Sequence, residues 1–144
     1  MNENQLLNKA ISIATAAHKN QVDKMRAPYL GHLTRVMNMG TTIDEKIAGV
    51  LHDLVEDTPW TFEQLENEGF PRHIIAALKC VTKTSDEEDY DEFIERVKTD
   101  PLAIKVKIND LTDNMDIRRI SVLTEKDLVR LNKYLEAYRD LVSL

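Results

Sequence analysis

The segment Leu51–Thr58, which reads LHDLVEDT, constrains the fold of this chain more than any other feature. His52 and Asp53 stand side by side inside an otherwise apolar helical pattern. An imidazole and a carboxylate in such a setting carry a desolvation cost unless a partner compensates for it. A divalent metal ion is such a partner, so the pair predicts further ligands elsewhere in the chain.

Two residues far from this pair in sequence complete a plausible ligand set. His32 lies upstream and Asp110 downstream, each in its own helix-like segment. Two imidazoles and two carboxylates form a mixed nitrogen and oxygen set that suits a divalent transition metal. A single histidine or a single His-Asp pair is weak evidence, but the combination is much rarer. We predict that these four residues bind one metal ion.

Two acidic residues follow the pair in helical register. Glu56 lies four residues after His52, and Asp57 lies four residues after Asp53. Residues four apart share a helix face, so both acids fall one turn beyond the predicted ligands. At that distance a carboxylate can orient or deprotonate a water instead of binding the ion. We therefore predict catalytic roles for Glu56 and Asp57.

Hydrophobic periodicity predicts an all-α fold, a compact bundle of about seven helices with short connections. No repeat, low-complexity segment or linker interrupts the pattern, which predicts a single domain over residues 1–144. A polar loop at 20–28 and an exposed acidic loop at 85–89 separate some of the helices. The predicted helices, one of them short, cover 4–19, 29–39, about 42–55, 61–69, 71–83, 90–98, 101 to about 117, and a last segment that opens at 124. In the last helix, one apolar face is expected to contain Leu128, Leu131, Leu135, Tyr138 and Leu141.

Composition and charge exclude several classes of protein. The net charge of −6 argues against a broad nucleic-acid surface, although a small anionic substrate can still meet a local basic patch. No apolar run approaches the roughly 20 residues of a membrane span. The N-terminus lacks the features of a signal peptide, so a cytoplasmic location is expected. Cys80 is the single cysteine, which excludes an internal disulfide, and it is expected to be a buried thiol.

Three stretches of the sequence together resemble one known family. They are Ala17–Gln21 (AHKNQ) with Pro28, Tyr29 and His32; the LHDLVEDT segment; and Val106–Asp110 (VKIND) with Asn114 and Met115. The chain resembles HD-domain phosphohydrolases, and among them the hydrolase domain of Rel/Spo-type (p)ppGpp enzymes and their small stand-alone relatives. The resemblance covers nearly the whole chain.

The resemblance implies a metal-dependent phosphohydrolase that acts on an anionic nucleotide such as (p)ppGpp, with pyrophosphate released from the ribose 3′ position. It implies one ion, with Mn²⁺ favoured and Fe, Zn, Ni, Co or Mg as alternatives, at the four predicted ligands. Glu56 and Asp57 would handle the attacking water. The residues implied to contact the nucleotide are Lys24, Asn114, Tyr134 and, in the last helix, Arg130.

The sequence also departs from the family pattern, which keeps other functions open. Asp23 reverses one charge of a basic pair, Leu111 replaces an arginine, and Leu33 stands where a proline is usual. These changes suggest an altered substrate wall. A catalytically inactive nucleotide-binding regulatory module is one alternative, and an HD hydrolase of another phosphorylated small molecule is a second. A di-iron HD oxygenase is less favoured, because it needs extra histidines and only His73 lies in the right interval. A homodimer also stays open.

Overall fold

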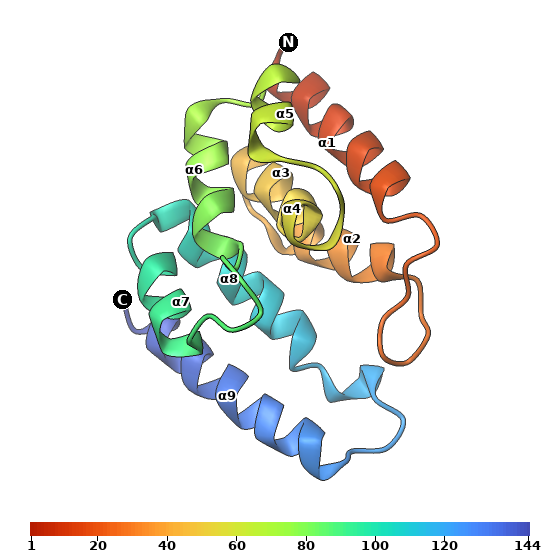
Figure 1. Ribbon diagram of the computed structural model, residues 1–144, viewed down its shortest axis with the longest axis vertical. Coiled ribbons are helices and arrows are strands. Elements are labelled where there is room, and N and C mark those ends of the chain that lie inside the picture. The colour runs from red at the N-terminus through yellow and green to blue at the C-terminus, as the bar shows by residue number, and fades with distance from the viewer.

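The computed structural model describes residues 1–144 and is built of helices joined by short loops (Figure 1). It contains no β-strand, only an isolated bridge between Val22 and Pro28. The predicted all-α class is therefore confirmed. The helices are α1 (Glu3–Ala17), α2 (Tyr29–Met39), α3 (Ile43–Leu51), α4 (Leu54–Asp57), α5 (Phe62–Asn67), α6 (Arg72–Val81), α7 (Tyr90–Val97), α8 (Pro101–Asn114), a 3₁₀ turn η1 (Ile117–Arg119) and α9 (Glu125–Val142).

Side-chain caps fix where several helices begin. Thr61 and Thr124 each accept a hydrogen bond from the backbone three residues on, and the residue there bonds back, which forms a capping box. Asp100 caps α8, and Pro101 occupies its first turn, where a missing N–H costs nothing. After α5, Gly69 takes a φ of +99°, a conformation that favours glycine. These boundaries agree with those predicted from the sequence.

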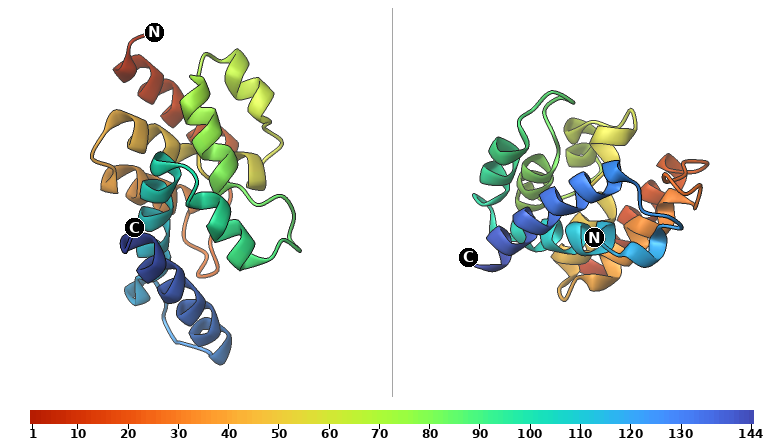
Figure 2. Two further views of the ribbon diagram at one scale, coloured as in Figure 1. Left: turned by 90° about the vertical axis from the view of Figure 1, so that its left-hand side faces the viewer. Right: turned by 90° about the horizontal axis from the view of Figure 1, so that it is seen from below.

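Helices α3 and α8 form the centre of the molecule. Helix α3 packs against α1, α2, α6 and α8, and α8 packs against α2, α3, α6, α7 and α9. One hydrophobic cluster includes Leu33 from α2, Leu51 from α3 and Leu111 from α8, all essentially inaccessible to solvent. Figures 1 and 2 show α1 and α9 at opposite ends of the molecule. Helix α8, which carries Asp110, and helix α3, which leads into His52 and Asp53, are thus the most enclosed helices.

The third predicted helix is broken at His52 and Asp53, which corrects the expectation of one helix to about Val55. In a continuous helix the Gly49 carbonyl would accept from the backbone N–H of Asp53. Here the Gly49 carbonyl accepts from His52 Nδ1, at 2.6 Å. The chain turns over His52 and Asp53 and resumes as the short helix α4. The break lets two adjacent side chains approach the same point.

Two further predicted details differ from the structure. Helix α8 ends at Asn114, short of Ile117, because Asp116 caps the separate turn η1. Cys80 is only half-buried, since it lies at the edge of α6 near Thr99.

The predicted apolar face of α9 is confirmed only in part. Leu141 is buried as predicted, but Leu128 and Leu135 are exposed, and Ala137, which was not predicted, is buried. Tyr134 and Tyr138 pack against the core between them. The reason is that α9 lies over α8 with the Tyr134 side toward the pockets described below.

None of the helices combines the length and the apolar character that crossing a membrane would require.

Candidate metal centre and nucleotide pocket

Three helical segments bring the four predicted ligands to one point. His32 comes from the first turn of α2, His52 and Asp53 from the turn between α3 and α4, and Asp110 from α8. His32, His52 and Asp53 each offer a ligand atom within 4.8 Å of the others. Asp110 Oδ1 lies 3.0 Å from His32 Nε2 and 3.1 Å from His52 Nε2. Asp53 Oδ2 lies 3.1 Å from His52 Nε2.

The hydrogen bonds on the far side of each ring determine which nitrogen faces this point. The Gly49 carbonyl can only accept, so His52 Nδ1 carries the hydrogen. His32 Nδ1 lies 2.6 Å from the Asp113 carboxylate, so it also donates. In the neutral form, both Nε2 atoms then present lone pairs toward the carboxylate oxygens. Such bonds behind the ring are how proteins orient metal-binding histidines.

This donor set fits a divalent cation. Two Nε2 lone pairs and two carboxylate oxygens are all acceptors, and acceptors at about 3 Å repel each other unless a positive charge lies among them. Imidazole and carboxylate together are typical ligands of first-row divalent metals. His32, His52 and Asp110 are buried, and Asp53 nearly so, which limits competition from water.

Without an ion, protons supply the missing positive charge. Burial disfavours the charged imidazolium of His52, but the carboxylates of Asp53 and Asp110 outweigh it and raise its pKa well above the usual value. Burial likewise opposes ionisation of Asp110, but Lys107 and His52 hold the pKa of this carboxyl well below its usual range. The cluster thus keeps its carboxylates charged and attracts a cation.

Sequence reasoning missed the residue that supports His32. Asp113 is 2% exposed, and its two oxygens accept from His32 Nδ1, from Arg35 Nε at 2.7 Å and from Arg119 Nη1 at 2.9 Å. The signal was in the sequence, because Asp113 follows Asp110 by three residues and so shares its helix face. Arg35 carried the same signal, because it follows His32 by three residues, whereas Arg119 lies outside α8 and had none.

Three more side chains hold the ligand carboxylates. The Tyr29 hydroxyl donates to Asp53 Oδ2 at 2.5 Å, and burial next to this carboxylate raises the pKa of Tyr29. The Lys107 ammonium donates to Asp110 Oδ2 at 2.9 Å, one helical turn away. Asn114 donates to Asp110 Oδ1 at 3.1 Å. These hydrogen bonds fix the orientation of the Asp53 and Asp110 carboxylates.

The two predicted catalytic acids differ in their surroundings. Glu56 lines a cavity of about 160 Å³ together with His52, Asp53 and Asp110, and its carboxylate accepts from the backbone N–H of Lys83 at 3.0 Å. The Asp57 carboxylate accepts no hydrogen bond and lies outside that cavity's lining. Burial and the charges of Asp53 and Glu56 raise the pKa of Asp57 to about 6.

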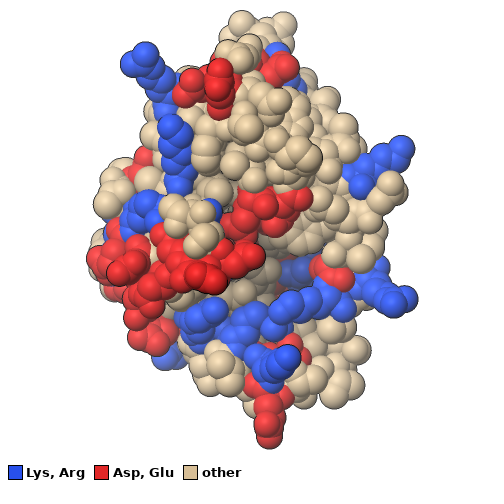
Figure 3. Space-filling view, in the orientation of Figure 1, with Lys and Arg blue, Asp and Glu red and all other residues tan.

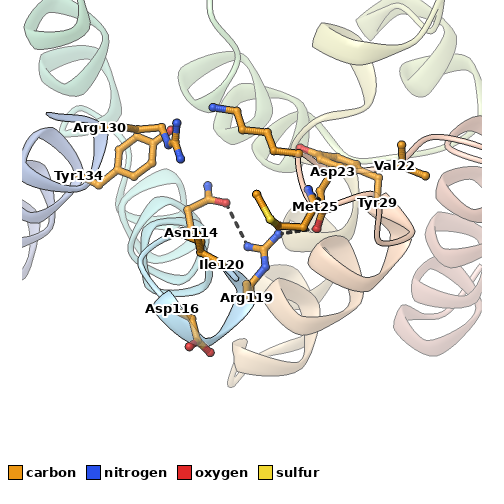
Figure 4. Close-up of a pocket in the computed structure, with 11 residues that line it drawn as sticks. Val22, Asp23, Met25, Tyr29, Asn114, Asp116, Arg119, Ile120, Arg130 and Tyr134 are labelled. Atoms are coloured by element: carbon orange, nitrogen blue, oxygen red, sulfur yellow. Dashed lines mark hydrogen bonds and ion pairs between the residues drawn. The ribbon is translucent and has the colours of Figure 1, made fainter. Parts of the chain in front are cut away.

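A larger cavity of about 330 Å³ adjoins the metal ligands (Figure 4). Its volume falls within the usual range for small-molecule pockets. Figure 4 shows Arg130 and Tyr134 of α9 on one side and Met25 and Tyr29 on the other. All four residues predicted to contact a nucleotide line it, namely Lys24, Asn114, Arg130 and Tyr134. Tyr29, Asn114 and Tyr134 line both cavities, so the two cavities are neighbours.

The departures from the family pattern have different structural consequences. Leu111 is fully buried in the hydrophobic core, so it does not alter the substrate wall as the sequence suggested. Leu33 is also a core residue. Asp23 does line the larger cavity, but it accepts from the backbone of Met25 and Ala27 and from Arg119. The Asp23 carboxylate therefore stabilises the loop that contains it and forms an ion pair with Arg119.

The other two histidines lie apart from the ligands. His18 ends α1 with its Nδ1 2.8 Å from Gln21 Oε1. His73 is exposed, with Nε2 2.9 Å from Asp44 Oδ2. His73 is therefore not placed to act as a ligand for a second metal ion beside His52.

Comparisons with known proteins agree with these motifs. No family model matches the chain. It is 28% identical over 120 residues to a guanosine-3′,5′-bis(diphosphate) 3′-pyrophosphohydrolase of Aquifex aeolicus, a match that covers 76% of this chain and 17% of the relative. It is 29% identical over 126 residues to a probable GTP pyrophosphokinase of Mycobacterium leprae, covering 79% of this chain and 16% of the relative. The chain thus spans about one sixth of the length of these curated relatives.

A solved structure matches the fold over nearly the whole chain. It is described as a metazoan ortholog of SpoT that hydrolyzes ppGpp. The TM-score is 0.77 at 22% sequence identity, and the match covers 94% of this chain and 84% of that one. The chain therefore shares the fold of a SpoT-like protein, and its sequence resembles part of the Rel/Spo-type (p)ppGpp enzymes, as its motifs predict.

Proposed function

We propose that residues 1–144 form one HD-type domain that hydrolyses a phosphate ester of a nucleotide with the help of one divalent metal. The observation that carries the proposal is the convergence of His32, His52, Asp53 and Asp110 beside a cavity of about 330 Å³ with cationic side chains on its wall. A cytoplasmic location stays a prediction.

The four ligands would hold the ion, with Mn²⁺ as our first choice and Fe, Zn, Ni, Co or Mg as alternatives. When bound, such an ion supplies Lewis-acid activation of a water and of a phosphoryl oxygen. Asp113, Tyr29 and Lys107 keep the ligand atoms aligned through the bonds described above.

Glu56 and Asp57 would act on the attacking water. The water oxygen forms a bond to the phosphorus of the scissile group, and the bond from that phosphorus to the ester oxygen breaks. Asp57 accepts the proton that the water loses, for which a pKa of about 6 is well suited near neutral pH. The departing oxygen takes up a proton. Glu56, fixed by the Lys83 backbone, would orient the water.

The larger cavity would bind the nucleoside. Tyr134 and Tyr29 offer aromatic surfaces, Asn114 offers an amide, and Lys24 and Arg130 offer positive charge for phosphate oxygens. Lys24 makes no ion pair, whereas Arg130 donates to Asp127 at 2.5 Å. Lys24 is therefore the more available of the two cations.

The relatives favour one substrate. Because the Aquifex relative is named for the 3′-pyrophosphohydrolysis of guanosine-3′,5′-bis(diphosphate), we propose (p)ppGpp as the first substrate to test. The scissile bond is then the one between the ribose 3′ oxygen and the adjacent phosphorus, and the products are pyrophosphate and a nucleoside 5′-phosphate.

The decisive experiment measures turnover and metal content together. Purified protein supplemented with each divalent metal is assayed on ppGpp, NADPH and a nucleotide panel. We expect the double variant H52A/D53A to lose the ion and more than about a thousandfold of the turnover, since metal activation contributes several kcal/mol. The matched control is H73A/D44A, which removes an exposed His-Asp pair and should retain full activity. Undiminished turnover by H52A/D53A would refute the metal site.

Two alternatives have distinct outcomes in the same experiment. A regulatory module would bind a nucleotide in the larger cavity without forming product. A hydrolase of another phosphorylated small molecule would release phosphate from a panel member other than ppGpp. A homodimer also stays a proposal, which the molecular mass in solution would decide.

A further inference from the structure

Three lysines surround the smaller cavity next to the metal ligands, and only one of them has an anionic partner. Lys83, Lys107 and Lys133 all line this space of about 160 Å³. Lys107 pairs with Asp110 at 2.9 Å. Lys83 and Lys133 form no ion pair, although the protein carries six more acids than bases. The role proposed for Lys24 does not extend to these two residues, because Lys24 lines the other cavity.

Two aromatic rings position the Lys133 ammonium, and a backbone hydrogen bond fixes the main chain of Lys83. The Lys133 ammonium lies 4.5 Å from the ring centre of Tyr90 and 5.7 Å from that of Tyr134. The main chain of Lys83 is fixed by its hydrogen bond to Glu56. Burial, then the nearby charges of Lys83 and Lys107, lower the pKa of Lys133. Two like charges held close together, at some electrostatic cost, are ready for an anion.

The charge of the cavity supports this view. Its lining contains three carboxylates, Asp53, Glu56 and Asp110, against the three lysines. A divalent ion at the ligands would leave this lining with a net charge of +2. Figure 3 shows Lys and Arg side chains along the lower edge of the hollow on this face, with acidic side chains above and to the left. Lys133 also borders an acidic groove beyond Tyr90 but forms no ion pair with its carboxylates.

We propose that Lys83 and Lys133 form a second phosphate subsite, which binds the phosphoryl group adjacent to the one attacked. This inference rests on the proposed function and extends it. The nucleoside would occupy the larger cavity, the attacked phosphorus would lie at the metal ligands, and the terminal phosphate would reach the two lysines. The subsite would make the enzyme prefer a pyrophosphoryl ester to a monophosphoryl ester at the scissile position.

The test uses inorganic pyrophosphate as the probe, because binding can be measured without turnover. Calorimetric titrations of the full chain, at a constant free Mn²⁺ concentration, compare the wild type with K83M/K133M. We expect pyrophosphate to bind at least about tenfold more weakly to the variant, the effect of losing one or two charge-assisted contacts. Orthophosphate, which would reach only the metal, should change by less than about twofold.

Two further variants make the test specific. K105M removes an exposed lysine of α8 and should bind pyrophosphate like the wild type. K83R/K133R keeps both charges and should restore most of the binding. Circular dichroism checks that all variants fold.

The outcomes separate this proposal from the proposed function. Unchanged pyrophosphate affinity in K83M/K133M, or no binding by the wild type, would overturn the subsite. If the wild type turns over no nucleotide but its pyrophosphate binding depends on the two lysines, the subsite stands and the hydrolase proposal fails. If the wild type cleaves ppGpp and K83M/K133M does so with equal kcat/KM, the hydrolase stands and the subsite fails.

Discussion

The metal-ligand cluster and the cavity walls beside it are built in opposite ways. In the cluster, His32, His52, Asp110 and Asp113 are buried, and each makes two or more polar contacts with its neighbours. On the walls, Lys24, Lys83 and Lys133 have no anionic partner. The cluster is a hydrogen-bonded network whose acceptor atoms can bind a cation. The walls instead present ammonium groups without an ion-pair partner, which can bind an anion.

The difference follows from the elements that carry each region. The cluster arises from α2, the turn between α3 and α4, and α8, which all pack against one another. The walls arise from the loop around Lys24, the end of α6 and one face of α9. Because packed helices tolerate little displacement, the cluster is rigid, while the walls can adapt to a substrate. Substitutions in the two regions should therefore affect different measured quantities.

Removing the proton acceptor should give the largest effect on the chemical step alone. We expect D57N to lower kcat by about 10²–10⁴-fold, the usual contribution of a general base. Metal content should stay at the wild-type value, since Asp57 meets the ligand Asp53 only through a backbone hydrogen bond at 3.0 Å, which the substitution keeps. Steady-state kinetics and elemental analysis of the same sample measure both. The matched control is E66Q on α5, and a loss of metal in D57N would place this residue in the cluster instead.

Weakening the support of His32 should affect the ion before the chemistry. We expect D113N to reduce metal affinity by about 10–100-fold, as substitutions behind metal ligands do. The new amide would also present N–H groups to Arg35 or Arg119, which costs roughly 1–3 kcal/mol of unfolding free energy. Metal titration and thermal denaturation test both. D86N, which alters an exposed acid of the 85–89 loop, should change neither.

A substitution in the wall of the larger cavity should weaken substrate binding and leave the metal content unchanged. We expect K24M to raise KM by about tenfold, with kcat within about twofold and unchanged metal content, because a charge-assisted contact contributes roughly 1.5–3 kcal/mol. K19M, an exposed lysine outside both cavities, is the control. If K24M lowered kcat instead, the assignment of the chemical step to the metal-ligand cluster and of substrate binding to the cavity walls would be wrong.

The smallest effect concerns acid stability away from the site. Arg96 bonds to Glu88 and lowers the pKa of this carboxyl from an ordinary 4.5 to about 2. Since the folded state holds the charged form, the pair stabilises the protein above about pH 4.5, and the contribution is lost as the pH falls toward 2. We expect E88Q to lower Tm slightly at pH 6 and to converge with the wild type near pH 2.

Thermal denaturation by circular dichroism between pH 2 and 6 measures this difference, with E87Q as the control for an exposed acid of the same loop. If the two variants behaved alike, the Arg96–Glu88 pair would contribute nothing to the pH dependence of stability.

Much of this arrangement could be predicted from local patterns. The caps at Thr61, Asp100 and Thr124 and the apolar spacing gave most helix boundaries, because capping and periodicity act over a few residues. The four ligands could be proposed because imidazoles and carboxylates in helices need a partner. The buried face of α9 was predicted correctly at Tyr138 and Leu141 but wrongly at Leu128 and Leu135, since apolar residues occur on more than one side of the helix and only packing selects among them.

The amino-acid sequence by itself determined the helical class, the helix starts and the four residues that can bind a metal, since each depends on residue chemistry and short-range spacing. Only the tertiary structure decided that the helix breaks at His52, that Asp113 orients His32, that Leu111 belongs to the core, and that Lys83 and Lys133 border one cavity. Apart from the break at His52, which is a local contact with Gly49, these features depend on segments far apart in sequence, such as Glu56 with Lys83, 27 residues apart, and His32 with Asp113, 81 residues apart. No local pattern encodes which distant segments will meet.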